Sequence, residues 1–262
     1  MPILHAIILG VIQGLTEILP ISSSAHLVIV PWVLKWPYQG LDYDVALHVG
    51  TALAILAYFF KDWVDIIKSA FGKSETYQKN ILLYIIVATI PAAALGLIFE
   101  NLAETIFRSP LVIISTLFIF AVILYLADRF GKKEVPLRKI SVKTSIFIGF
   151  AQALALIPGV SRSGITITAG LYKGLSREAA AKFSFLLATP IIISAGILEL
   201  SKLSFTDLNL VFWTGVVASA VSGFITINFL LNFVKKSSMN LFVIYRICLA
   251  VFMLILFLAR QS

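Results

Sequence analysis

Residues 145–172 read SIFIGFAQALALIPGVSRSGITITAGLY, and the topology of the chain follows from this stretch. Its apolar run is interrupted near the middle by Pro158, Gly159 and Ser161. Lys143 precedes the stretch and more basic residues follow it, so both flanks resemble cytoplasmic loops. A segment that enters and leaves on one side of a membrane predicts a re-entrant helix–turn–helix. Such non-helical backbone is tolerated only against protein or a wet cavity.

The composition of the chain is that of an integral membrane protein. Of its 262 residues, 60% are hydrophobic and 13% are charged, whereas soluble domains have about 45–50% apolar and about 25% charged residues. The apolar runs are continuous rather than alternating, which favours membrane helices over a barrel. The net charge of +8 comes from basic residues in particular loops. It therefore indicates membrane orientation and not a nucleic-acid partner.

Six apolar stretches are long enough to cross a hydrocarbon core of about 30 Å. These predicted spans are 44–60, 80–99, 110–127, 183–200, 210–234 and 241–259. Lysine and arginine are concentrated in the loops 61–79, 128–144 and 235–240, so the positive-inside rule places these three loops in the cytoplasm. The loops 100–109 and 201–209 carry one basic residue each and are expected outside.

A second broken segment, residues 3–34, lies near the amino terminus. It contains what we call the first motif, Gln13 to His26, with Pro20 and three consecutive serines. Because the span 44–60 must end in the cytoplasm, this segment is expected to enter the membrane from outside. The stretch Gly10 to Leu15 aligns with Gly149 to Leu154 and, after a one-residue gap, Pro20 aligns with Pro158 and Ser23 with Ser161.

These observations predict an inverted repeat. Each half has one hairpin and three spans, and an odd number of spans inverts the second half in the membrane. The expected fold is therefore a single all-α, polytopic membrane domain with six transmembrane helices plus two re-entrant helical hairpins. The repeats are expected at about 1–130 and 131–262, with the hairpins meeting near the midplane.

The first motif combines a carboxylate, an imidazole and hydroxyls. On a helix, Gln13 and Glu17 share a face, as do Ser23 and His26 if a second helix starts after Pro20. Intramembrane ionisable groups are functional candidates by default. Glu17 could instead be a capping or salt-bridging carboxylate, and His26 a satisfied interior histidine. The other two serines of the run can cap a helix, and His48 is expected to pack or to support the site from behind.

The second motif, Pro158 to Thr166, has the composition of an anion cradle. Gly159 allows close backbone approach, and a following helix offers free N–H donors and a positive dipole end. Arg162 can grip phosphate oxygens with two nitrogens, and the hydroxyls of this motif add donors: Ser161, Ser163 and Thr166. The alternative is a Gly/Ser turn with an arginine that snorkels to an interface. Arg246 lies near a cytoplasmic loop, so we expect it to snorkel outside the site.

Together, the two motifs closely resemble those of the bacterial undecaprenyl-diphosphate phosphatase family of the bacitracin-resistance type, over essentially the whole chain. The resemblance implies an integral membrane hydrolase of the cytoplasmic (inner) membrane. Such an enzyme removes the terminal phosphate of the C55 lipid diphosphate, returns the carrier to cell-wall synthesis and confers bacitracin resistance. It also implies Mg²⁺ or Ca²⁺ dependence, a site open to the extracytoplasmic side, and a possible homodimer.

The resemblance also implies roles for individual residues. Glu17, Ser23, His26 and Arg162 would be catalytic, and Glu17 and Gln13 would bind the metal. The resemblance assigns the substrate phosphates to Ser161, Arg162 and Thr166, and the composition of the second motif adds Ser163 and Gly159 to this set. The family has Glu or Gln at the first acidic position, which is Gln13 here. An amide can coordinate a metal through oxygen but cannot act as a base, so Glu17 carries more of the chemistry.

Three nucleophiles are compatible with these residues. Ser23 could attack while His26 or Glu17 takes its proton, His26 could attack directly, or a metal-bound water could be activated by Glu17. We favour Ser23. The main alternative function is a transporter or flippase of polyprenyl phosphate lipids, because broken helices that meet at mid-membrane are also the architecture of secondary transporters.

Overall fold

Helices make up most of the chain in this computed structural model, which describes residues 2–37, 41–99, 109–200 and 208–260. Within these ranges, extended pairing is limited to one isolated bridge between Val135 and Leu175. The predicted all-α fold is therefore confirmed.

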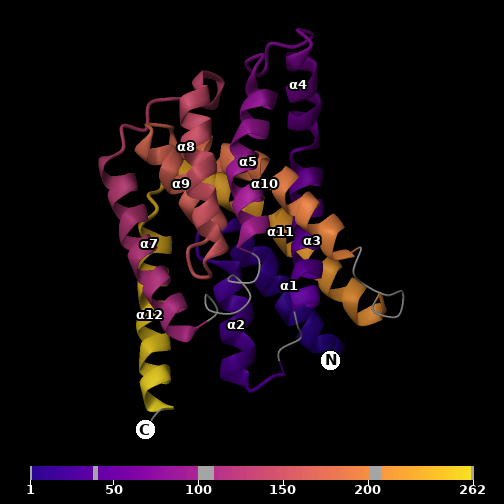
Figure 1. Cartoon of the computed structure of the whole chain (residues 1–262), viewed down its shortest axis with the longest axis vertical. Helices are drawn as coiled ribbons and strands as arrows, with labels where there is room; N and C mark the ends of the chain where they lie inside the picture. Colours follow the sequence, from indigo (N-terminus) through magenta and orange to yellow (C-terminus); the bar gives the residue numbers. More distant parts are fainter. Residues whose placement is uncertain (1, 38–40, 100–108, 201–207, 261–262) are drawn as a thin grey trace.

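Each of the six predicted spans forms a helix. They are α3 (Leu41–Tyr58), α5 (Ile81–Ile98), α7 (Pro110–Phe130), α10 (Arg177–Leu200), α11 (Leu210–Lys236) and α12 (Asn240–Ala259). Within the described residues, α5, α7, α10, α11 and α12 are long and apolar enough to cross a membrane. A further helix, α4 (Phe60–Ala70), follows α3 and projects beyond the others at the upper end of Figure 1.

Both broken segments form two short helices separated by a turn. The first gives α1 (Ile3–Ile18) and α2 (Ser23–Leu34), and the second gives α8 (Val142–Ala153), a short 3₁₀ turn and α9 (Arg162–Tyr172). At 1.5 Å per residue, even α1 is only about 24 Å long, less than the bilayer core. In Figure 1, α1 and α2 occupy the lower half of the molecule, while α8 and α9 lie in the upper half.

The two turns have the same local structure. Ser22 and Ser161 both have positive φ, at 75° and 71°, and each precedes the second helix of its pair. The Ser22 hydroxyl accepts the N–H of Ala25, and the Ser161 hydroxyl accepts the N–H of Gly164. Ser161 therefore corresponds to Ser22, in the same register as Gly10 and Gly149. The expected one-residue gap, which paired Ser23 with Ser161, is wrong.

Small residues allow α1 to lie directly against α11. A Cβ added to Gly14 would lie 1.9 Å from the hydroxyl of Ser222, and one added to Gly10 would lie 2.5 Å from the carbonyl oxygen of Gly215. Helix α3 approaches the same small residues of α11 beside α1, and there Ser219 donates to the carbonyl of Leu47 at 2.7 Å. The small residues of α11 thus serve packing inside one chain, as is common between membrane helices.

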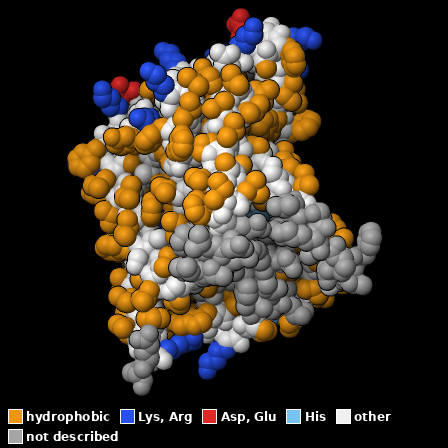
Figure 2. Space-filling model, in the orientation of Figure 1, with side chains coloured by type: hydrophobic (Ala, Val, Ile, Leu, Met, Phe, Trp, Pro, Cys, Tyr) orange, Lys and Arg blue, Asp and Glu red, His pale blue; other side chains and the backbone are white. Residues whose placement is uncertain are grey.

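Charged side chains gather at the ends of the molecule, and a broad apolar band separates them (Figure 2). At the more highly charged end, the buried carboxylate of Asp128 joins three helices. It accepts from Arg177 Nε at 2.6 Å and from the backbone N–H of Met239 at 3.0 Å. This pairing satisfies a charge that would be costly to bury alone.

Candidate active site

The two turns meet in the interior of the molecule. We call residues 19–22 the first break and residues 157–161 the second break. Just after the second break, Ser163 donates its hydroxyl hydrogen to the carbonyl of Leu19 at 3.0 Å. Arg246 donates to the carbonyls of Pro20 at 3.3 Å and Gly159 at 2.8 Å, so it contacts both breaks. The two motifs therefore form one site, as their composition suggested.

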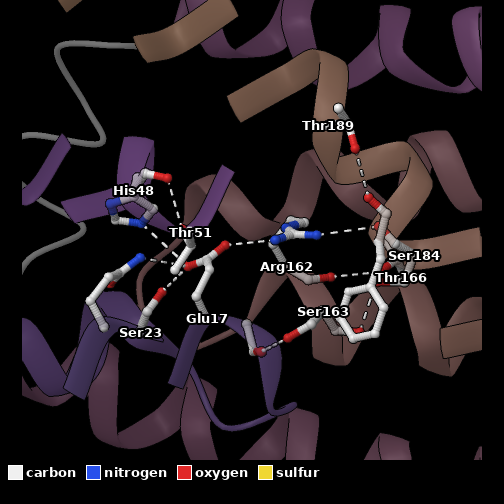
Figure 3. A network of polar contacts seen from close by, with 12 residues as sticks. Glu17, Ser23, His48, Thr51, Arg162, Ser163, Thr166, Ser184 and Thr189 are labelled. Atoms are coloured by element: carbon white, nitrogen blue, oxygen red, sulfur yellow. Dashed lines mark hydrogen bonds and ion pairs between the residues drawn. The ribbon is translucent and has the colours of Figure 1, made fainter. Parts of the chain in front are cut away.

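Glu17 is the centre of this site: it accepts hydrogen bonds from three side chains and lies beside the imidazole of a fourth (Figure 3). Its Oε1 is 2.7 Å from Nη2 of Arg162. Its Oε2 accepts the hydroxyl of Ser23 and lies 3.3 Å from both Nε2 of Gln13 and Nε2 of His48. Only 6% of Glu17 is exposed, so this partner set compensates for the burial of its charge.

A second layer of contacts orients the partners of Glu17. His48 Nδ1 is 2.7 Å from the carbonyl oxygen of Asp44. Because a carbonyl can only accept, Nδ1 holds a proton, and Nε2 is left to share a proton with Glu17. Arg162 Nη1 donates to the carbonyl of Ser184 at 3.3 Å, which leaves further N–H groups of the guanidinium available to a ligand.

A cavity of about 310 Å³ opens onto these groups. Its polar lining comprises Glu17, Ser22, Ser23, Ser24, His48, Gln152, Ser161 and Arg162. Its other lining residues are small or apolar and come mainly from α5, α10 and the 3₁₀ turn after α8: Ala92, Ala155, Leu156, Ile191, Ile192, Ala195 and Gly196. The cavity thus offers a charged, hydrogen-bonding floor beside an apolar wall.

Two helices begin at this cavity. The lining includes Ser22 and Ser23 at the start of α2, and Ser161 and Arg162 at the start of α9. A helix amino terminus carries partial positive charge and N–H groups without helical partners, so it favours anions. Two such ends and a guanidinium make this region suitable for a multiply charged anion such as a phosphate.

The predicted phosphate-binding residues divide into two groups. Ser161 and Arg162 line the cavity, whereas Gly159, Ser163 and Thr166 lie outside its described lining. Thr166 lies 2.6 Å from the Ser184 hydroxyl, beside the Arg162 contact. Gly159 has φ of 92°, and a Cβ there would lie 2.1 Å from Thr116 Oγ1. It therefore allows the second break to pack on α7.

The structure places the imidazole of His48, and not that of His26, against Glu17. His26 lies outside the described cavity lining, with Nδ1 2.7 Å from the carbonyl oxygen of Ser22 and Nε2 2.7 Å from the hydroxyl of Tyr245. The catalytic role of His26 stays a prediction. The imidazole that contacts Glu17 is His48, which we expected to pack or to act from behind the site. The only signal in the sequence is its place beside Asp44 and Thr51 on one face of an apolar helix.

Arg246 is the main residue that the sequence analysis misjudged. We expected it to snorkel to an interface, but it is fully buried. It donates to Gly159 and Val160 carbonyls of the second break at 2.8 and 3.1 Å, to Pro20 of the first break, and to Leu117 of α7 at 3.3 Å. Broken helices leave carbonyls without helical donors, so a site with two breaks requires such a donor.

The side-chain oxygen atoms of Glu17 and Gln13 are of the kind that a hard divalent cation prefers. Mg²⁺ and Ca²⁺ prefer oxygen ligands, and Gln13 Oε1 is a buried acceptor that has no hydrogen-bond donor among the described residues. This oxygen belongs to the same side-chain amide whose nitrogen contacts Glu17. In the described part of the chain, no three His, Cys, Asp or Glu side chains lie close enough together to hold a metal ion. Protein ligands would therefore be few, and phosphate oxygens and water would complete the coordination shell.

Comparison with known proteins gives a consistent result. Residues 6–252 match the family model described as bacitracin resistance protein BacA. The chain is 52% identical over 252 residues to an undecaprenyl-diphosphatase of Elusimicrobium minutum, covering 96% of each chain. It is 48% identical over 261 residues to one of Moorella thermoacetica, covering 100% of each, and 49% identical over 261 residues to one of Pelotomaculum thermopropionicum, covering 100% of this chain and 99% of the relative. The chain therefore belongs to the BacA bacitracin resistance protein family.

Proposed function

We propose that this protein hydrolyses undecaprenyl diphosphate to undecaprenyl phosphate and inorganic phosphate. Relatives of nearly equal length carry the name of this activity. The observation that carries the proposal is the meeting of Arg162, the starts of α2 and α9, and the carboxylate of Glu17 at one cavity. This arrangement supplies electrostatic stabilisation for phosphoryl transfer, in which positioning and charge dominate catalysis. The apolar wall suits the first part of a prenyl chain.

In the proposed reaction, Ser23 is the nucleophile and Glu17 is its base. Glu17 Oε2 already accepts the hydroxyl of Ser23, while Arg162 holds Oε1. As Ser23 Oγ bonds to the terminal phosphorus, the bond from that phosphorus to the bridging oxygen breaks. Glu17 takes the serine proton and passes it to the departing lipid phosphate. Water then attacks the phosphoserine, and Glu17 takes a proton from water and returns it to Ser23.

A divalent cation would be held by Glu17 and by Oε1 of Gln13. Bound there, Mg²⁺ or Ca²⁺ would neutralise charge on the phosphate oxygens. Unlike a glutamate at this position, the amide of Gln13 supplies an oxygen ligand without adding a second negative charge. His48, which shares a proton with Glu17, would adjust how readily that carboxylate accepts the proton of Ser23.

The arrangement in the membrane is also part of the proposal. We infer six transmembrane helices and two hairpins that enter from opposite sides of a bacterial inner membrane. Figure 1 supports this by placing α1 and α2 in the half opposite to α8 and α9. On α5 and α10, the cavity is lined by residues in the second half of each helix: Ala92, Ile191, Ile192, Ala195 and Gly196. Because the basic loops precede both helices, this position favours opening to the extracytoplasmic side.

The direct test uses purified protein in detergent with undecaprenyl diphosphate and Mg²⁺ or Ca²⁺. Release of inorganic phosphate is expected, and Ser23→Ala should abolish it. Rapid quenching with substrate labelled in the terminal phosphate should trap an acid-stable phosphoserine. Ser194→Ala, on α10 outside the described cavity lining, is the control. Full activity of Ser23→Ala without a phosphoserine would reject the serine nucleophile.

The second candidate is a transporter or flippase of polyprenyl phosphate lipids. The paired broken helices favour it, because they also characterise secondary transporters. In detergent, transport has no meaning, so hydrolysis there separates the two functions. Absence of phosphate release, together with movement of lipid phosphate across liposomes, would establish the transporter instead.

A further inference from the structure

Gln152 lines the active-site cavity without a protein partner for its amide. It lies in the last turn of α8 and is only 2% exposed. Neither its Nε2 nor its Oε1 has a hydrogen-bond partner among the residues that the structure describes. Most buried polar side chains have such partners, so this amide requires an explanation.

The equivalent residue of the other hairpin behaves differently. Gln13 stands at the same distance from Ser22 as Gln152 does from Ser161. The amide nitrogen of Gln13 contacts Glu17 at 3.3 Å. At the position that corresponds to Glu17, the second hairpin has Leu156, which cannot accept a hydrogen bond. Gln152 therefore lacks the contact that Gln13 makes with Glu17, and it lines the cavity with both amide atoms unpaired among the described residues.

The position of Gln152 indicates which part of a substrate it can reach. It lies on the same chain segment as Ala155 and Leu156, which belong to the apolar wall. Ser23 and Arg162 lie at the polar floor, where the terminal phosphate must react. In a lipid diphosphate, the phosphate that bears the prenyl chain lies between the reacting phosphate and the apolar tail. Because Gln152 lines the same cavity and is close in sequence to the apolar wall, we expect its amide to face this inner phosphate.

We propose that Gln152 is a positioning residue that donates its amide N–H to the inner, prenyl-bearing phosphate of the substrate. This proposal rests on the proposed diphosphatase function. The contact recognises a phosphate through a neutral donor, so it adds no charge that would retain the monophosphate product too tightly. It also gives the free protein a reason to bury an unpaired amide, because the ligand supplies the partner.

The proposal predicts opposite effects on binding and on stability. Gln152→Leu keeps most of the volume and removes the amide. It should weaken binding of farnesyl phosphate, a soluble prenyl monophosphate, about tenfold, or about 1.4 kcal/mol. Inhibition by inorganic phosphate, which uses the terminal subsite, should stay unchanged. Because an unpaired buried amide is replaced by an apolar group, the unfolding temperature should stay equal or rise.

Gln78→Leu is the matched control. Gln78 donates its amide to the carbonyl of Ile140 at 2.7 Å, away from the cavity. Its loss should lower the unfolding temperature and leave farnesyl phosphate binding unchanged. Gln152→Asn, which keeps a shorter amide, should bind farnesyl phosphate with intermediate affinity.

Binding is measured directly by calorimetry on the purified full chain, so the result does not depend on turnover. Unchanged farnesyl phosphate affinity in Gln152→Leu would overturn the proposal, as would equal loss of affinity for farnesyl phosphate and inorganic phosphate. A lowered unfolding temperature with unchanged affinity would assign Gln152 a structural role. If the wild-type protein binds farnesyl phosphate through Gln152 but releases no phosphate from the diphosphate, the proposed function fails and the subsite stands.

Discussion

Replacement of Arg246 by Met tests whether one buried side chain holds the two breaks together. Arg246 is fully buried, and its two shortest contacts are to the carbonyls of Gly159 and Val160, at 2.8 and 3.1 Å. A third contact, 3.3 Å to Pro20, reaches the first break. Methionine fills much of the volume but donates no hydrogen bond.

The expected loss follows from these contacts. A buried acceptor left without its donor costs about 1–3 kcal/mol. With two close carbonyls affected, and removal of the buried charge offsetting part of the loss, the free energy of unfolding should fall by about 2–4 kcal/mol. Activity should fall by about tenfold or more, because the angle between the breaks sets the position of Glu17 against Arg162.

The assay combines unfolding in a detergent titration with phosphate release at 25 °C. Arg246→Lys should recover part of the stability, since an ammonium can reach some of the carbonyls but lacks the planar fork. Surface substitutions usually change the free energy of unfolding by no more than about 0.5 kcal/mol. An Arg246→Met variant whose free energy of unfolding lies within that range of wild type, and which retains at least a third of the activity, would refute this reasoning.

Further predictions concern the residues around Glu17. Arg162→Ala should lower kcat/KM by more than about 100-fold in the phosphate-release assay, about 2.7 kcal/mol of transition-state stabilisation; activity within tenfold of wild type would reject its role. Glu17→Ala and Arg162→Ala should each lower the free energy of unfolding by roughly 3–5 kcal/mol, because each leaves one buried charge without its partner. The double variant should lose less than the sum of the two single losses, and strict additivity would contradict the pairing. Removal of divalent ions with EDTA should abolish activity, Mg²⁺ or Ca²⁺ should restore it, and Gln13→Leu should raise the ion concentration required. Gly14→Val should separate α1 from α11 and lower the free energy of unfolding by about 1–3 kcal/mol; an unchanged unfolding curve would argue against this packing.

The apolar runs and their breaks were enough to predict the helices other than α4, which occupies Phe60–Ala70 in the basic segment expected as the loop 61–79. Continuous apolar stretches of sufficient length became α3, α5, α7, α10, α11 and α12, because apolar side chains determine which segments can lie in a membrane. Pro, Gly and Ser marked both hairpins because they disfavour helix continuation or cap the next helix. The turn register was missed, since Ser22 and Ser23 are indistinguishable until the positive φ of Ser22 is known.

The site was predicted only in part, for a physical reason. Glu17, Ser23 and Arg162 could be identified because charged or nucleophilic groups within apolar sequence have few structural uses. His48 and Arg246 act through contacts with segments distant in sequence, namely Glu17 and the carbonyls of both breaks. A sequence pattern records periodicity within one helix, but it does not show which helices become neighbours.

The shared turn geometry has a consequence for how such a site could arise. Ser23 and Arg162 are the first residues after equivalent capping serines, yet one carries a hydroxyl and the other a positive charge. Two identical half-length subunits would bring two copies of the same side chain to the place where the turns meet, either a pair of repelling guanidiniums or a pair of hydroxyls without a cation. Linking both halves in one chain allows each turn to acquire its own substitution. A single chain that carries both hairpins can therefore place different side chains at the two turns. A symmetric dimer of one hairpin could not.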